Sequence, residues 1–278
     1  QLAPLVPRLR CPQCGTPLAL LENRSLVCER RHCFDLSAKG YVNLAPGHDQ
    51  AADKYDAALF ESRARIFAGG FYNHVAQEIV ALTTDARISR SIGEEPPTTP
   101  LVVDVGCGEG YYARALAQHH PQSTVVGVDL SRDAILAAAR QAPTLSWLVA
   151  DLTRLPFADR SVQVLLDVLT PADYREFARV LAPAGLLVKV IPADDYLIEI
   201  RRAVAKQLHN ADFSNARVIA HLEENAEVIA RRTVRQTLPV TPEQAADFYR
   251  MTPMTFGMDG SQLSGLQLTQ ITVAMEVL

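Results

Sequence analysis

Short apolar runs alternate with helical patterns over residues 101–191, and this alternation predicts an α/β domain with a mostly parallel sheet. Nearly unbroken apolar runs are typical of parallel strands that are buried on both faces. A helix is expected at 111–118, after the first strand, and a turn at 183–185, before the last. The strands are expected at 102–105, 124–129, 145–149, 162–168 and 186–191.

The rest of the chain has other patterns. Apolar residues at helical spacing over 56–83 predict two helices, because Gly69 and Gly70 interrupt the spacing. A terminal strand pair is expected at 234–240 and 268–278. Further helices are expected at 196–208, 215–230 and 242–251.

Composition marks the boundaries between these parts. Residues 46–55 are small or polar and predict a loop, and the proline-containing residues 89–100 predict a linker. The predicted domains are therefore a cysteine-rich module at 1–45, a helical connector and linker at 46–100, and the α/β domain at 101–278.

The first strand runs into a glycine-rich turn with the spacing G-x-G-x-G, formed by Gly106, Gly108 and Gly110. A dinucleotide fingerprint requires G-x-G-x-x-G, and this pattern fails because residue 111 is tyrosine. Asp104, two residues before the first glycine, suits a ligand with a cationic amino group better than a pyrophosphate. The turn therefore predicts a site for S-adenosylmethionine.

The next two strands also end in acidic residues, where open α/β sheets bind their ligands. Asp129 lies 19 residues after Gly110 and is placed to accept hydrogen bonds from both hydroxyls of a ribose. Asp151 is placed to accept one from an adenine amino group, with Leu152 packed on the ring. We include Leu130, next to Asp129, in this predicted cofactor site.

Four of the five cysteines cluster near the start of the chain, in an arrangement typical of a metal site. Cys11, Cys14, Cys28 and His32 have the spacing C-x2-C-x13-C-x3-H and complete a four-coordinate Zn²⁺ shell. A closed shell of this kind is structural. Cys33 competes with His32 for the fourth position. We expect the module to fold on its metal and to be separable from cofactor binding.

Charge is distributed unevenly along the chain. The net charge is −4, yet residues 1–45 carry +3, so the remainder carries −7. A basic head suits a polyanion, although the total charge argues against one. No apolar run reaches the roughly 18 residues of a membrane span, and we expect no signal peptide. In a cytosolic α/β enzyme, such a cysteine cluster indicates metal binding more readily than disulfides.

These features together resemble the bacterial 23S rRNA (guanine-N1)-methyltransferases of the RlmA type, which include the tylosin-resistance enzymes. The resemblance covers essentially the whole chain. It rests on the cysteine-rich head, Phe34-Asp35, residues 40–44, Gly70-Phe71-Tyr72, residues 104–112, Leu155-Pro156-Phe157, Thr170-Pro171 and Met251-Thr252-Pro253.

The resemblance implies a class I S-adenosylmethionine-dependent methyltransferase with a Rossmann-like fold and an N-terminal zinc-binding module. It implies a cytoplasmic homodimer that methylates N1 of a guanine in a hairpin loop of 23S rRNA, with the zinc module helping to recognise RNA. The family's metal ligands fall on Cys11, Cys14, Cys28 and His32. Its cofactor contacts fall on Tyr72, Tyr112, Ala113 and Tyr196.

Methylation at guanine N1 requires an acceptor for the N1 proton. The segment from Asp167 to Pro171 leaves the fourth strand where an extruded base would meet the methyl group. Asp167 and Thr170 are the candidate acceptors, although Asp167 is equally a candidate for a hydrogen-bonded residue at a strand end.

Two alternatives remain open at this point. One is a small-molecule methyltransferase, which gives no reason for a basic zinc module. The other is a zinc-headed RNA-binding protein without catalysis, against which the complete set of cofactor acids counts.

Overall fold

The computed structural model describes residues 2–47, 57–84, 99–205, 214–256, 258 and 268–278. The chain packs into two compact units, one formed by Gln1–Asp56 and Val80–Lys189 and the other by Ala57–Ile79 and Val190–Leu278. This packing does not follow the predicted segments 1–45, 46–100 and 101–278, which stay a prediction. Most of the predicted loop at 46–55 and linker at 89–100 lies outside the described residues. Within the described part, no helix is long and apolar enough to cross a membrane.

The first unit contains the predicted parallel strands, which confirms the α/β class. Its sheet includes β4 (Tyr41–Asn43), four central strands β5 to β8, and β9 (Leu181–Pro192). Hydrogen bonds join these strands in the order β9-β8-β5-β6-β7-β4, and the pairs β8–β5, β5–β6 and β6–β7 are parallel. Every residue of β5 and β8 is buried, as unbroken apolar runs predict. The central strands are β5 (Leu101–Val105), β6 (Thr124–Asp129), β7 (Ser146–Val149) and β8 (Val162–Val168).

Helices of the first unit begin directly after these strands. Gly110 is the N-cap of α4 (Tyr111–His119), and the Ser131 side chain caps α5 (Arg132–Gln141). Asp173 caps α6 (Tyr174–Val180) in the same way. Because the caps lie close to the carboxyl ends of the strands, the helix N-termini meet the edge where a ligand is expected.

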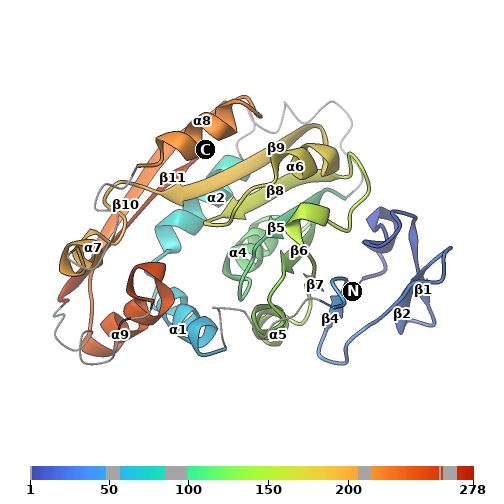
Figure 1. Ribbon diagram of the computed structural model, residues 1–278, viewed down its shortest axis with the longest axis horizontal. Helices are drawn as coiled ribbons and strands as arrows, with labels where there is room; N and C mark the ends of the chain where they lie inside the picture. The colour runs from blue at the N-terminus through green and yellow to red at the C-terminus, as the bar shows by residue number, and fades with distance from the viewer. Residues whose placement is uncertain (1, 48–56, 85–98, 206–213, 257, 259–267) are drawn as a thin grey trace. The chain divides into compact units, whose positions relative to one another are not determined.

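The N-terminal module is joined to this sheet. After the 3-10 turn Val6–Arg8, strands β1 (Leu18–Leu21), β2 (Ser25–Cys28) and β3 (Cys33–Asp35) form a small antiparallel sheet, blue in Figure 1. Strand β4 (Tyr41–Asn43) then pairs in parallel with β7.

Backbone hydrogen bonds also tie the module to the segment that follows Asp151. The N–H of Arg10 donates to the carbonyl of Pro156, and the N–H of Ala158 donates to the carbonyl of Arg8. The backbone of the module thus continues the edge of the sheet and pairs with a loop beside the predicted cofactor site. The expectation that cofactor binding is separable from the module stays a prediction.

The second unit is formed by helices and an antiparallel strand pair. The break at Gly69-Gly70 is confirmed, because it separates α1 (Ala57–Ala68) from α2 (Asn73–Thr84). Arg65 of α1 donates two hydrogen bonds, of 2.8 and 2.6 Å, to the carboxylate of Asp247 in α9 (Pro242–Met251). Strands β10 (Arg232–Pro239) and β11 (Gln270–Val277) pair as predicted, and β11 also pairs with the end of β9 (Leu181–Pro192).

Three expected boundaries differ from the structure. The turn at 183–185 lies inside β9, where Ala184 has φ 58°, so the chain kinks without ending the strand. Helix α8 (Ala216–Glu223) ends seven residues early, because the Asn225 side chain donates to the carbonyl of His221 and replaces the next helical bond. Helix α7 (Ile198–Ala203) begins two residues after the expected start at 196 and ends before 204, while residues 206–208 of the expected helix lie outside the described residues.

Candidate functional site

The predicted glycine turn (residues 106–110) lies at the carboxyl end of β5 and requires glycine for two reasons. Gly106 has φ 66° and Gly110 has φ 77°, in the left-handed region that other residues rarely adopt. A Cβ atom on Gly106 would lie 2.2 Å from Oγ1 of Thr170, and one on Gly110 would lie 2.3 Å from the Trp147 ring. The turn is therefore packed directly against side chains of the neighbouring strands.

Asp104 places a buried carboxylate beneath this turn, with 1% of its surface exposed. Burial raises the pKa of Asp104 well above its usual range, and the carboxylates of Asp129, Glu109 and Asp167 raise it further, although a hydrogen bond from the Ala113 backbone opposes the shift. Among the described residues, Oδ2 of Asp104 has no hydrogen-bond partner. Closely spaced buried acids of this kind favour a ligand that carries positive charge.

Asp129 ends β6 with a carboxylate that the backbone holds in place. Its Oδ2 accepts a hydrogen bond of 2.8 Å from the N–H of Gly108, and its Oδ1 accepts one of 2.8 Å from the N–H of Ser131. A carboxylate oxygen has two lone pairs, so the half-buried Asp129 retains acceptor capacity for a ligand. Its predicted role toward a ribose fits this arrangement and stays a prediction.

Asp151 is also fixed, by the turn that follows β7. Its Oδ1 accepts hydrogen bonds of 2.8 Å from the N–H and from the hydroxyl of Thr153. Leu130 and Leu152, next to the two strand-end acids, are half-buried. These residues lie on the same edge as the glycine turn because β5, β6 and β7 are parallel neighbours.

The remaining predicted cofactor residues fall in two groups. Tyr112 and Ala113 are buried in the first turn of α4, directly after the glycine turn. Tyr72 and Tyr196 belong to the second unit, where their hydroxyl oxygens are hydrogen-bonded at 2.8 Å. Their contacts with a cofactor stay predictions.

Asp167, at the end of β8, is completely buried and paired with a lysine. Nζ of Lys189 donates a hydrogen bond of 2.7 Å to Oδ2 of Asp167 and another of 2.6 Å to the carbonyl of Thr170. Burial raises the pKa of Asp167 to about 6, while the positive charge of Lys189 lowers it. Asp167 has no exposed surface from which to take a substrate proton, so the structure favours the strand-end alternative.

Lys189, which binds Asp167 and the Thr170 carbonyl, is a residue of this edge that the sequence analysis did not single out. It is the one charged side chain in the apolar run 186–191 and is 4% exposed. A lysine is almost never buried without a partner, so its place in a predicted core strand was a readable signal.

The β8 loop (residues 168–171) contains a second residue that sequence did not indicate. Leu169 has φ 55°, and this left-handed conformation costs a residue with a Cβ atom roughly 1–2 kcal/mol. The Leu169 side chain is nevertheless 43% exposed. Strain of this kind clusters at functional sites.

The second candidate site is the predicted metal centre. Gly15, with φ 74°, closes the turn between Cys11 and Thr16 by donating its N–H to the carbonyl of Cys11 at 2.8 Å. Arg31, with φ 64°, donates its N–H to the carbonyl of Cys28 at 2.8 Å and turns the chain back. The two turns bring Cys11, Cys14, Cys28 and His32 together.

The distances between the ligand atoms fit a tetrahedral Zn²⁺ shell. A tetrahedron with metal–sulfur bonds of about 2.3 Å has edges of about 3.8 Å, and edges to nitrogen are shorter. The Sγ atoms of Cys14 and Cys28 lie 3.7 Å apart, and Nδ1 of His32 lies 3.3 Å from Sγ of Cys11 and 3.4 Å from Sγ of Cys28. All four ligand atoms lie within 4.8 Å of one another.

Cys33 does not belong to this cluster. It is exposed, and its Sγ lies 3.9 Å from Oδ1 of Asp35. The choice of His32 as fourth ligand is therefore supported. Hydrogen bonding to the Thr16 hydroxyl, at 3.1 Å, lowers the pKa of Cys14 to about 6, which favours the thiolate that binds a metal.

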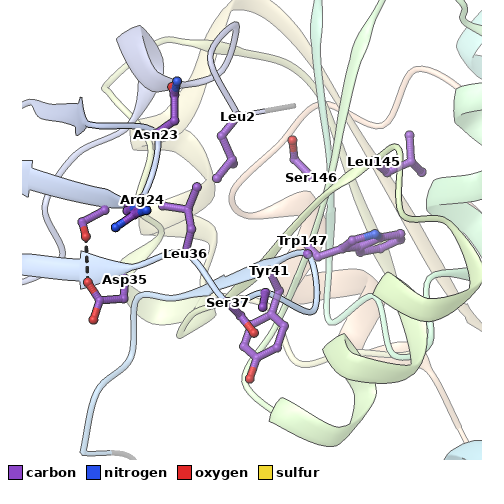
Figure 2. A pocket seen from close by; sticks show the side chains of 13 residues that line it. Leu2, Asn23, Arg24, Asp35, Leu36, Ser37, Tyr41, Leu145, Ser146 and Trp147 are labelled. Atoms are coloured by element: carbon purple, nitrogen blue, oxygen red, sulfur yellow. Dashed lines mark hydrogen bonds between the residues drawn. The ribbon is translucent and has the colours of Figure 1, made fainter.

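A cavity of about 660 Å³ lies between the N-terminal strands and β7 (Figure 2). Arg24 and Leu36 line it from the module, and Ser146 lines it from the start of β7. None of the predicted cofactor residues lines this cavity, so it is distinct from the edge where the strands β5–β8 end.

Comparison with known families identifies the two parts of the first unit. A methyltransferase-domain model matches residues 102–185. A second model, described as "RlmA, N-terminal", matches residues 9–52 and thus includes all four metal-ligating residues.

Three relatives match the chain over most of its length. A putative 23S rRNA (guanine-N1)-methyltransferase from Bacillus subtilis, YxjB, is 34% identical and covers 97% of this chain and 95% of the relative. A putative 23S rRNA (guanine-N1)-methyltransferase from Micromonospora griseorubida is 32% identical and covers 94% of this chain and 90% of the relative. The 23S rRNA (guanine(748)-N1)-methyltransferase from Streptomyces fradiae is 30% identical and covers 92% of this chain and 88% of the relative.

We predict that Cys11→Ser combined with Cys14→Ser abolishes stoichiometric zinc binding, because two of four thiolate or imidazole ligands are lost. The thermal unfolding midpoint should fall as well, since the module is hydrogen-bonded to the sheet. Elemental analysis and calorimetry measure the two effects. Cys33→Ser is the matched control and should retain one zinc ion per chain; loss of zinc from this variant would show that the ligand set is wrong.

Proposed function

The chain belongs to the 23S rRNA (guanine-N1)-methyltransferase family, and we propose that it methylates N1 of a guanine in a hairpin loop of 23S rRNA. The methyl donor is S-adenosylmethionine. We further propose that the protein acts in the cytoplasm as a homodimer, and that its zinc module takes part in RNA recognition.

The observation that carries this proposal is the contact between the glycine turn and the β8 loop. Thr170 packs against Gly106 so closely that a Cβ atom on the glycine would overlap its hydroxyl. Asp104, with its acidic neighbours, lies two residues before Gly106, and the exposed Leu169 directly precedes Thr170. This arrangement supports a cationic donor and an extruded base at adjacent positions on one edge.

The residues at this edge supply orientation rather than covalent chemistry. Bound S-adenosylmethionine supplies an electrophilic methyl group on a sulfonium. Asp104 holds the amino group of the donor, Asp129 its ribose and Asp151 its adenine, with Leu130 and Leu152 excluding water around them. As the bond from N1 to the methyl carbon forms and the carbon–sulfur bond breaks, the N1 proton passes to water.

Thr170 is the better candidate for contact with the N1 proton, because Asp167 is buried. Its hydroxyl donates a hydrogen bond of 3.2 Å to the carbonyl of Val168 and keeps lone pairs that are able to accept one from N1–H. A hairpin loop is a suitable substrate because its bases unstack at low cost.

The activity is tested with purified protein, labelled S-adenosylmethionine and 23S rRNA hairpins. We expect label in the RNA, and mass mapping should locate it as 1-methylguanine. Donor binding with transfer only to small molecules would favour a small-molecule methyltransferase. RNA binding without donor binding would favour a non-catalytic RNA-binding protein, and either result would overturn the proposal.

We predict that Asp129→Ala weakens S-adenosylmethionine binding by roughly 10–100-fold, because hydrogen bonds to a charged acceptor are lost from the ribose. Calorimetric titration measures the change. Asp133→Ala, at an exposed acidic position in the first turn of α5, is the matched control and should bind normally. Equal affinities in all three proteins would refute the ribose assignment.

We predict that Arg30→Ala combined with Arg31→Ala weakens RNA binding, because both exposed arginines flank the metal site on the basic module. The dependence of log affinity on log salt should lose about one unit of slope for each phosphate contact removed. Binding is measured between low and moderate salt. Arg217→Ala, an exposed arginine in α8, is the control, and an unchanged slope in the double variant would exclude the module from phosphate binding.

A further inference from the structure

Leu169 combines two properties that ordinary packing does not explain. Its backbone is held at φ 55°, a conformation that glycine or asparagine adopts more readily. It is also 43% exposed, and it is one of the few large apolar residues with this much exposure among the described residues. A strained and exposed apolar residue at the end of a central strand therefore requires another explanation.

The residues around Leu169 hold this conformation in place. Lys189 joins both sides of it, because the same Nζ atom binds the Asp167 carboxylate at 2.7 Å and the Thr170 carbonyl at 2.6 Å. The Thr170 hydroxyl is bound to the Val168 carbonyl at 3.2 Å. The backbone before and after Leu169 is thus fixed from inside the unit, while its side chain stays outside.

The fixed loop also lies against the cofactor edge. Thr170, the next residue, contacts Gly106 of the glycine turn. Leu169 is therefore one residue from the surface at which the proposed donor binds, and it is the exposed large apolar side chain there.

We propose that Leu169 packs against the face of the target guanine, and that Lys189 is the positioning residue that holds it there. This inference rests on the proposed function and deepens it by naming a contact to the extruded base. Enzymes that extrude a base hold it by stacking on aromatic or apolar side chains. An exposed leucine gives such an apolar surface.

The variant Leu169→Gly removes the side chain and also relieves the backbone strain, so it distinguishes the effect of the side chain on activity from an effect on stability. Glycine adopts the left-handed conformation without cost, so the thermal unfolding midpoint should stay equal or rise. The donor affinity should stay within about twofold, whereas kcat/KM for the rRNA hairpin should fall by roughly 10–100-fold through the loss of base stacking. Leu169→Asn, which also tolerates this conformation, should behave in the same way.

Two further variants complete the test of Leu169. Leu169→Phe supplies an aromatic face and should keep kcat/KM within about threefold of the wild type. Val218→Ala, at an apolar position in α8 that is 40% exposed, is the control and should keep full activity. Unchanged kcat/KM for RNA in Leu169→Gly, or an equal loss of donor affinity, would overturn the inference.

A double-mutant cycle tests the role of Lys189. Lys189→Met should lower kcat, and in a Leu169→Gly background it should add little, because Lys189 acts through Leu169. Additive losses would show that Lys189 has only a structural role and would overturn its part of the inference. Wild-type protein that binds donor but methylates no rRNA hairpin would overturn the proposed function, and this inference with it.

Discussion

The cost of burying carboxylates at one edge of a parallel sheet constrains this protein more than any other interaction. Parallel pairing places the ends of β5, β6, β7 and β8 side by side, and three of these strands contain an acid at or next to their last residue. The three carboxylates differ in the groups that stabilise them. Lys189 neutralises Asp167, backbone N–H groups hold Asp129, and Asp104 keeps an oxygen without a partner among the described residues.

The same constraint explains the division of roles along this edge. A buried acid that is paired with a cation of the same protein has a structural role. The Asp167–Lys189 pair therefore holds the β8 loop, and the Asp167 carboxylate is not exposed to a substrate. Asp129 is held by backbone N–H groups instead, and burial raises the pKa of Asp104, so a cationic ligand beside Asp104 would favour its carboxylate form. A buried pair adds little net stability against its desolvation cost. Its value here lies in fixing one backbone geometry.

The metal site and the sheet depend on each other in a similar way. A module of about 45 residues buries too little apolar surface to be stable alone, and a metal shell compensates. Strand β4 then extends the sheet beyond β7, and the backbone at Arg8 and Arg10 pairs with the segment after Asp151. Backbone hydrogen bonds therefore connect the module that contains the metal ligands to the strands of the cofactor edge.

The sequence by itself determined the strands, the glycine turn and the four metal ligands, because periodicity, positive-φ glycines and ligand spacing are local properties. It also pointed to Asp104, Asp129 and Asp151 as candidate cofactor residues, since each lies at or just beyond the end of a predicted strand. Only the tertiary structure decided that Asp167 is paired, that Leu169 is strained and exposed, and that the N-terminal module joins the sheet. These depend on Lys189, 22 residues from Asp167 along the chain, and on β7, more than 100 residues from β4. Contacts between segments that are distant in the sequence do not produce a repeating pattern of residues, so they cannot be predicted from periodicity.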